Sequence, residues 1–121
     1  MKTARDPRHL KRIHLIKQLF SWDFNQQGEA GGQIKDITRH LKKIDHLILE
    51  SAPQRPLKQI NKIDLAILRL AIFELIIKKN TPIKVVVDEA VELGKQFGSA
   101  ASSSFVNGVL GTLIEKEDIK T

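Results

Sequence analysis

The sequence of 121 residues contains no cysteine, no tyrosine and only four prolines. The absence of cysteine excludes disulfide bonds and thiolate-ligated metal sites, which agrees with a reducing cytoplasm. No apolar run approaches the roughly 20 residues that a membrane-spanning helix requires. Lys11, Arg12 and Lys17 interrupt any apolar signal core near the N-terminus. We therefore predict a soluble, cytoplasmic protein without a membrane partner.

The sequence also lacks the residue patterns of an active site. The serine run at residues 102–104 has neither a nucleophile elbow nor a neighbouring base. No glycine-rich loop has phosphate-binding spacing, and the acidic group Asp88, Glu89 and Glu92 is typical of a solvated helix face. The histidines follow no metal-ligand spacing, and we expect them at the surface: His9, His14, His40 and His46. We predict no enzymatic activity, catalytic residue, metal or cofactor.

Positive charge is concentrated at the N-terminus. Twenty Lys and Arg residues against 14 Asp and Glu residues give a net charge of +6. Residues 1–17 contain six basic side chains and one acidic one, Asp6, whereas the remainder is nearly neutral. Such a cluster attracts polyanions, of which phosphate backbones are the commonest. A solvated helix face explains the cluster equally well on composition alone.

A chain of this length with 41% hydrophobic residues is predicted to form one domain over residues 1–121. Asp6-Pro7 is a typical helix start, and apolar residues at steps of three or four predict a first helix that ends before Gly28. The same spacing predicts a second helix over residues 34–48. Pro53 and Pro56 then mark a loop, followed by a short helical turn.

The second half of the chain predicts three further helices. Residues 64–78 are apolar on nearly all sides, which indicates a buried central helix capped by Asp64. Residues 83–87 favour a strand by propensity, but helical spacing continues to Phe97, so we predict a helix that ends at Gly98. The last helix starts at Ser99 or Ser102. Glycine inside a helix costs about 1 kcal/mol relative to alanine, so we expect Gly108 to permit close helix packing. The predicted fold is all-α.

Three segments in a fixed order, residues 63–75, 88–98 and 105–110, resemble the C-terminal part of the NusB family of transcription antitermination factors. Residues 18–25, with the sequence QLFSWDFN, resemble the family's aromatic-x-Trp segment. The resemblance implies an all-helical bundle of two small helical subdomains. The region between Trp22 and Ile63 is shorter here than in familiar members, so one family helix is expected to be shortened or missing.

The resemblance also implies a function. Family members bind boxA sequences of ribosomal RNA leader transcripts together with NusE, a small-subunit ribosomal protein, so that RNA polymerase resists termination. We therefore expect this chain to bind single-stranded, boxA-like RNA and NusE within an RNA polymerase antitermination complex. The sequence leaves self-association into a homodimer open.

The resemblance assigns the RNA surface to the basic first helix and to two aromatic positions. Arg8 and Arg12 match family positions that face RNA, and we expect both to be exposed. Phe97 and Phe105 match aromatic positions where a base could stack, although core packing explains these two residues as well. The predicted RNA-binding residues are Arg5, Arg8, Lys11, Arg12, Phe97 and Phe105.

Phe20 and Asp64 match positions at which the family meets NusE. Phe20 replaces the usual Tyr and lacks its hydroxyl. The alternative for Asp64 is that it serves only as a helix cap and does not contact NusE. Residues 100–104 lack the acidic pair and the Lys that commonly precede the family's Phe, so Ser104 offers no cation to RNA. We therefore expect weak RNA binding by the chain alone and stronger binding with NusE.

Two alternatives remain. A similar domain is fused to ribosomal RNA cytosine methyltransferases, and this chain could represent such an accessory module, detached from its catalytic domain. The other alternative is a helical protein-interaction module without independent recognition of an RNA sequence.

Overall fold

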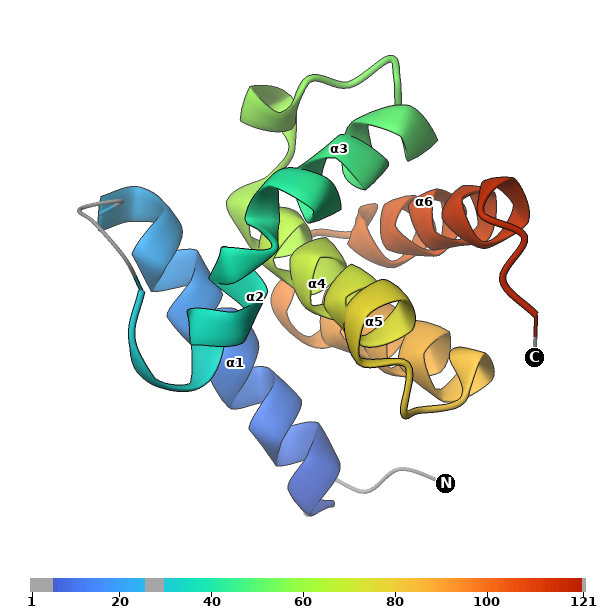
Figure 1. Cartoon of the computed structure of the whole chain (residues 1–121). Helices are drawn as coiled ribbons and strands as arrows, with labels where there is room; N and C mark the ends of the chain where they lie inside the picture. The colour runs from blue at the N-terminus through green and yellow to red at the C-terminus, as the bar shows by residue number, and fades with distance from the viewer. Residues whose placement is uncertain (1–5, 26–29, 121) are drawn as a thin grey trace.

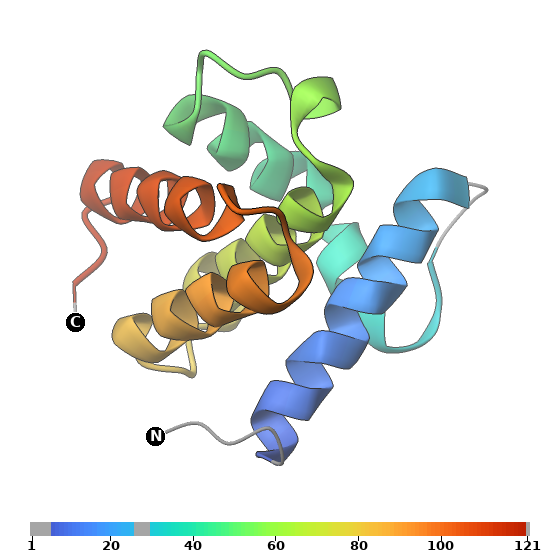
Figure 2. The same cartoon turned by 180° about the vertical axis from the view of Figure 1, so that it is seen from behind.

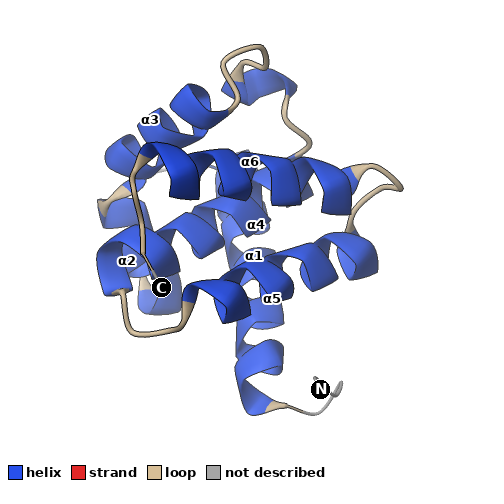
Figure 3. Cartoon of the chain, turned by 90° about the vertical axis from the view of Figure 1, so that its right-hand side faces the viewer, coloured by secondary structure: helices blue, strands red, loops and turns tan. Residues whose placement is uncertain are grey.

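The computed structural model describes residues 6–25 and 30–120. Its α-helices are α1 (Pro7–Asn25), α2 (Lys35–Arg39), α3 (Leu41–Ser51), α4 (Lys62–Ile72), α5 (Ile83–Phe97) and α6 (Ser102–Lys116) (Figure 1). Short 3-10 turns, η1 (Gly32–Ile34) and η2 (Leu57–Gln59), lie before α2 and α4, and a π-helical segment, η3 (Phe73–Lys78), extends α4. The described residues contain no strand (Figure 3), which confirms the predicted all-α fold. None of the described helices has the length and apolar character needed to cross a membrane.

Helix α4 lies at the centre of the molecule, as its nearly uniform apolar character predicts. Every residue from Asp64 to Ile72 is buried. Helix α1 packs along one side of α4, while α5 and α6 lie side by side and cover another part of it (Figure 2). Helix α3 packs on both α4 and α6. Apolar side chains from α1, α3, α4, α5 and α6 thus join in one core.

Residues 34–48, predicted as a single helix, are divided between η1, α2 and α3. The break lies at His40, whose φ and ψ angles of −103° and 14° depart from helical values. Thr38 Oγ1 donates hydrogen bonds to two carbonyl oxygens of the preceding turn, at 3.1 and 3.0 Å, an arrangement that often bends helices. Ile37 and Ile44 are buried on either side of the break. The apolar spacing therefore continues across it and does not reveal it.

Asn61, and not Asp64, caps α4. The Asn61 side chain accepts a hydrogen bond from the backbone N–H of Ile63 at 2.9 Å. The predicted Asp64 cap is wrong because the helix begins at Lys62, which places Asp64 inside the first turn.

Helices α5 and α6 approach each other closely. The β-branched residues 83–87 belong to α5, which confirms the helical prediction, and α5 ends before Gly98 as predicted. A Cβ atom at Gly94 would lie 3.2 Å from the Cα of Ser103, so this glycine permits the close approach. A Cβ at Gly108 would meet no atom within 4 Å, so the predicted packing role of Gly108 is wrong.

Candidate nucleic-acid interface

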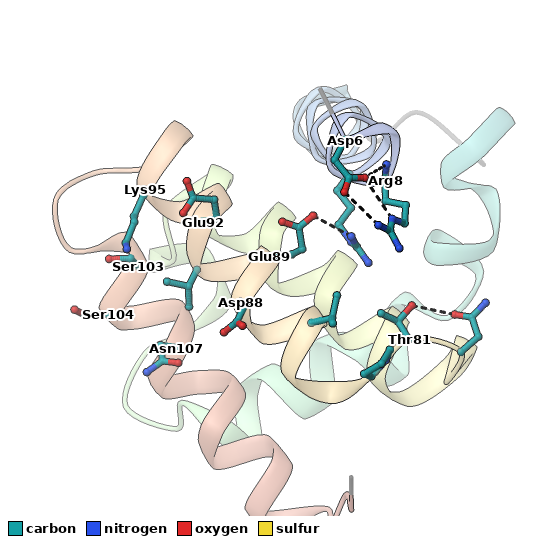
Figure 4. Close-up of a pocket in the computed structure, with 15 residues that line it drawn as sticks. Asp6, Arg8, Thr81, Asp88, Glu89, Glu92, Lys95, Ser103, Ser104 and Asn107 are labelled. Atoms are coloured by element: carbon teal, nitrogen blue, oxygen red, sulfur yellow. Dashed lines mark hydrogen bonds and ion pairs between the residues drawn. The ribbon is translucent and has the colours of Figure 1, made fainter. Parts of the chain in front are cut away.

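An open groove of 1190 Å³ lies between the start of α1, helix α5 and the start of α6. Figure 4 shows Asp6 and Arg8 on one side of it, and Ser103, Ser104 and Asn107 on the other. The acidic side chains between them come from α5. The charged residues that line the groove are Asp6, Arg8, Arg12, Asp88, Glu89, Glu92 and Lys95. The groove is therefore mixed in charge, with its basic residues near the two edges.

Arg8 is an exposed cation of this groove, with 84% of its side chain accessible to solvent. The Asp6 carboxylate accepts hydrogen bonds from the Arg8 backbone N–H at 2.9 Å and from Arg8 Nη2 at 3.2 Å. The hydrogen bonds from the Arg8 side chain and backbone lower the pKa of the Asp6 carboxyl group. Lys11 is also exposed, and Arg5 lies outside the described residues.

Arg12 differs from Arg8, because only 11% of its side chain is exposed. Its Nε and Nη2 atoms donate to the two Glu74 carboxylate oxygens at 2.9 and 2.7 Å, and Nη1 donates to Glu89 Oε1 at 3.0 Å. The hydrogen bonds with Glu74 are the main reason why the pKa of Arg12 is raised. The predicted exposure of Arg12 is wrong, because this side of α1 faces carboxylates from η3 and α5.

His9 is also buried, which corrects the prediction that it lies at the surface. Its Nδ1 atom lies 3.1 Å from Glu89 Oε2, and its Nε2 atom lies 2.8 Å from Gln96 Oε1. We refer to His9, Arg12, Glu74 and Glu89 as the Arg12 cluster. The cluster ties the start of α1 to η3 and α5. The two glutamates lie far along the chain from His9 and Arg12, so no local sequence motif predicts the cluster.

Phe97 and Phe105 lie on either side of the loop that joins α5 to α6, and both are half-buried against the core. A cation lies over each ring. Lys17 Nζ is 5.6 Å from the centroid of the Phe97 ring, and Arg55 Cζ is 4.5 Å from the centroid of the Phe105 ring. Each aromatic residue thus contributes to the core and is also partly exposed at the surface. The sequence analysis did not identify Lys17 and Arg55 as their neighbours.

The other end of α1 presents aromatic rather than basic side chains. Phe20 and Phe24 meet edge to face, with ring centroids 4.9 Å apart, and Phe24 is 62% exposed. Both line a shallow hollow of 620 Å³ together with residues 58–63. Asp64, which directly follows this segment, is buried, and its Oδ1 atom has no hydrogen-bond partner among the described residues. The two predicted partner-binding residues therefore lie on or next to one hollow.

A second buried ionic cluster lies beneath this end of α1. Arg69 donates to both Asp45 carboxylate oxygens at 3.0 Å and to Asp23 Oδ1 at 3.2 Å. Lys62 Nζ lies 2.7 Å from Asp23 Oδ2. We refer to Asp23, Asp45, Lys62 and Arg69 as the Arg69 cluster. It ties the end of α1 to α3 and α4, and sequence reasoning missed it because its members come from three helices.

A model of the NusB family matches residues 33–115. The chain belongs to the NusB family. It is similar to the transcription antitermination protein NusB of Chloroflexus aggregans, with 52% identity over 79 residues that cover 64% of this chain and 53% of that protein. It is 51% identical to NusB of Roseiflexus castenholzii, again over 79 residues, which cover 64% of this chain and 56% of that protein. The chain thus spans about half the length of these curated relatives.

Solved structures show the same fold. The structure of T. maritima NusB superimposes with a TM-score of 0.80 at 30% identity, over 96% of this chain and 94% of that one. A chain from a complex of NusB and NusE with double-stranded RNA has a TM-score of 0.74 at 21% identity, over 92% of this chain and 99% of that one. The predicted family and fold are confirmed. The relatives are named as antitermination proteins, which agrees with the prediction that this NusB-family chain is not an enzyme.

Proposed function

We propose that this chain acts in transcription antitermination by binding boxA-like RNA together with NusE, within an RNA polymerase antitermination complex. The observation that carries the proposal is the 52% identity to a protein named as an antitermination factor. This identity favours antitermination over an accessory module of a methyltransferase. The basic start of α1 and the half-buried aromatic rings of α5 and α6 support RNA binding in particular.

We propose that the RNA contacts the basic start of α1 and the two aromatic residues on either side of the α5–α6 loop. Arg8 and Lys11 are exposed and can contact phosphates, and Phe97 and Phe105 offer ring surface to bases. Arg5 is proposed as an additional phosphate contact. The N–H groups of Arg12 already donate to Glu74 and Glu89. Arg12 therefore supports this surface indirectly, by holding the start of α1 against η3 and α5.

The acidic residues of the groove support weak binding by the chain alone. Asp88 and Glu92 line it from α5, and Ser104 contributes no positive charge. Carboxylates near a phosphate backbone reduce the attraction that the basic edge provides. A partner that supplies further contacts would therefore have a large effect on RNA affinity.

We propose that NusE binds at the hollow formed by Phe20, Phe24 and residues 58–63. An exposed aromatic side chain is a common anchor of protein interfaces.

Titration of boxA-like and scrambled single-stranded RNA, each with and without NusE from the same organism, tests the proposed function. Without NusE we expect dissociation constants of micromolar order, as for a small basic domain that binds weakly. With NusE, the boxA-like RNA should bind more tightly than the scrambled RNA. Equal binding of both RNAs under every condition would contradict the antitermination role. Tight, selective binding by the chain alone would contradict only the dependence on NusE.

A further inference from the structure

Arg55 occupies a position next to the candidate RNA surface that the sequence did not mark. It is exposed in the loop between α3 and η2, and its guanidinium carbon lies 4.5 Å from the centroid of the Phe105 ring. A planar guanidinium at this distance from an aromatic ring is attracted by the ring's negative face. The loop is thereby joined to the first turn of α6.

The loop holds Arg55 in place by means other than this contact. Pro53 and Pro56 flank the residue, and the proline ring restricts the backbone φ angle at both positions. The Arg55 backbone N–H also donates to the carbonyl oxygen of Ala52 at 3.1 Å. A restrained loop loses less conformational entropy when it binds a ligand.

The hydrogen-bonding groups of Arg55 differ from those of the two buried arginines. Arg12 and Arg69 donate to carboxylates inside their clusters, whereas Arg55 forms no ion pair within residues 6–25 and 30–120. Its N–H groups can therefore bind a phosphate in the two-pronged manner that suits guanidinium. Arg55 thus combines an aromatic neighbour with a guanidinium group that makes no ion pair among the described residues.

We infer that Arg55 and Phe105 form one binding element for single-stranded RNA, in which the guanidinium contacts a phosphate and the stacked pair supports a base. The inference deepens the proposed RNA-binding function and rests on it. It supplies, from another loop, the positive charge that Ser104 lacks beside Phe105. The pair of Lys17 and Phe97 on the other side of the α5–α6 loop provides a second cation beside an aromatic ring, so an RNA strand that crosses this loop would meet both.

The test compares the full chain with Arg55→Ala, Arg55→Lys and the control Lys43→Ala. Lys43 is an exposed cation on α3, so its loss matches the change in net charge. Binding of a fluorescent boxA-like RNA is measured at two salt concentrations, with and without NusE, and binding of NusE is measured separately. Arg55→Ala should weaken binding roughly tenfold, because a charge-assisted hydrogen bond and a stacking surface are lost. It should also reduce the slope of log K against log salt by about 0.7, the value for one single-strand phosphate contact.

The variant Arg55→Lys separates the effect of the positive charge from the effect of the planar guanidinium group. Arg55→Lys should keep the salt slope but still bind more weakly than the natural chain, because ammonium lacks the planar face. Lys43→Ala should leave affinity and slope nearly unchanged. Combining Arg55→Ala with Phe105→Leu should cost less than the two single changes together, because both disrupt one element.

Several outcomes would overturn the inference. Arg55→Ala could bind RNA as the natural chain does, or more tightly, which would mean that Arg55 only covers the ring. It could instead lose NusE and keep RNA, which would assign the pair to a protein interface. Additive effects of the two substitutions would show that the residues act separately. If the natural chain binds no RNA with or without NusE, the proposed function itself fails; if it binds and Arg55→Ala binds equally, only the present inference fails.

Discussion

At its start, α1 contributes a buried arginine to two glutamates, whereas near its end it contributes a buried aspartate to an arginine and a lysine. Arg12 pairs with Glu74 and Glu89, and Asp23 pairs with Lys62 and Arg69. The charges are reversed, yet both clusters attach α1 to the rest of the bundle. A charged side chain on this helix is therefore not evidence of a binding site until its partners are known.

The exposed residues beside the two clusters differ more than the clusters do. Arg8 and Lys11 make the start of α1 basic, whereas Phe20 and Phe24 make its end aromatic. One helix thus presents two surfaces of different chemistry, one basic and one aromatic. The buried clusters hold both surfaces in a fixed relation to the core.

The largest effect is expected when the Arg12 cluster is broken by charge reversal. Arg12→Glu would place a third carboxylate beside Glu74 and Glu89. Breaking a buried ion pair costs about 3–5 kcal/mol, and reversal should lower the free energy of unfolding by at least this amount. Urea denaturation followed by circular dichroism measures the change. Arg8→Glu is the matched control and should leave the urea midpoint almost unchanged while weakening RNA binding. Equal denaturation midpoints for the two variants would show that the Arg12 cluster does not hold α1.

A somewhat smaller effect is expected from truncation in the Arg69 cluster. Arg69→Ala would leave Asp23 and Asp45 without their shared partner, and we expect a loss of about 3 kcal/mol in the free energy of unfolding. Lys62 also contacts Asp23, but its side chain is 41% exposed, so Lys62→Ala should cost less than about 1 kcal/mol. The same denaturation experiment compares the two. A larger loss of unfolding free energy from Lys62→Ala would mean that the exposed Lys62–Asp23 pair, and not the buried pairs of Arg69, holds the end of α1 in place.

The smallest effect on stability is expected at the exposed end of α1. Phe24→Ala should leave the denaturation midpoint nearly unchanged but weaken NusE binding roughly tenfold, as for an interface anchor. Leu10→Ala is the matched control, because Leu10 is an exposed apolar residue (48%) near the other end of the same helix. Isothermal titration calorimetry measures the affinity of both variants for NusE. A similar loss from Leu10→Ala would place the protein surface elsewhere on α1.

The sequence predicted most helix positions correctly, and the wrong predictions have local physical causes. The spacing of apolar residues correctly favoured a helix at residues 83–87 over the strand that β-branched residues prefer. The same spacing concealed the break at His40, because core-facing positions continue through it. The sequence also could not distinguish Gly94 from Gly108. The backbone of Ser103 lies close to Gly94, whereas a Cβ atom at Gly108 would meet no atom of the described residues within 4 Å.

The sequence predicted less of the candidate site than of the fold. Arg8 and Arg12 are similar in type and lie one helical turn apart, yet one is exposed and the other is buried between glutamates that are distant along the chain. The family resemblance indicated Phe105 but gave no indication of Arg55, since these two residues meet only when α3 and α6 pack together.

The sequence by itself determined the helical class, the buried central helix and the membership in the NusB family, because these depend on apolar spacing and on residue identities in a fixed order. Tertiary structure alone decided which charges remain available to a ligand. Burial and pairing depend on side chains that distant segments bring together. For that reason Arg12 became part of the framework of this protein, while Arg8 and Arg55 remained exposed to solvent.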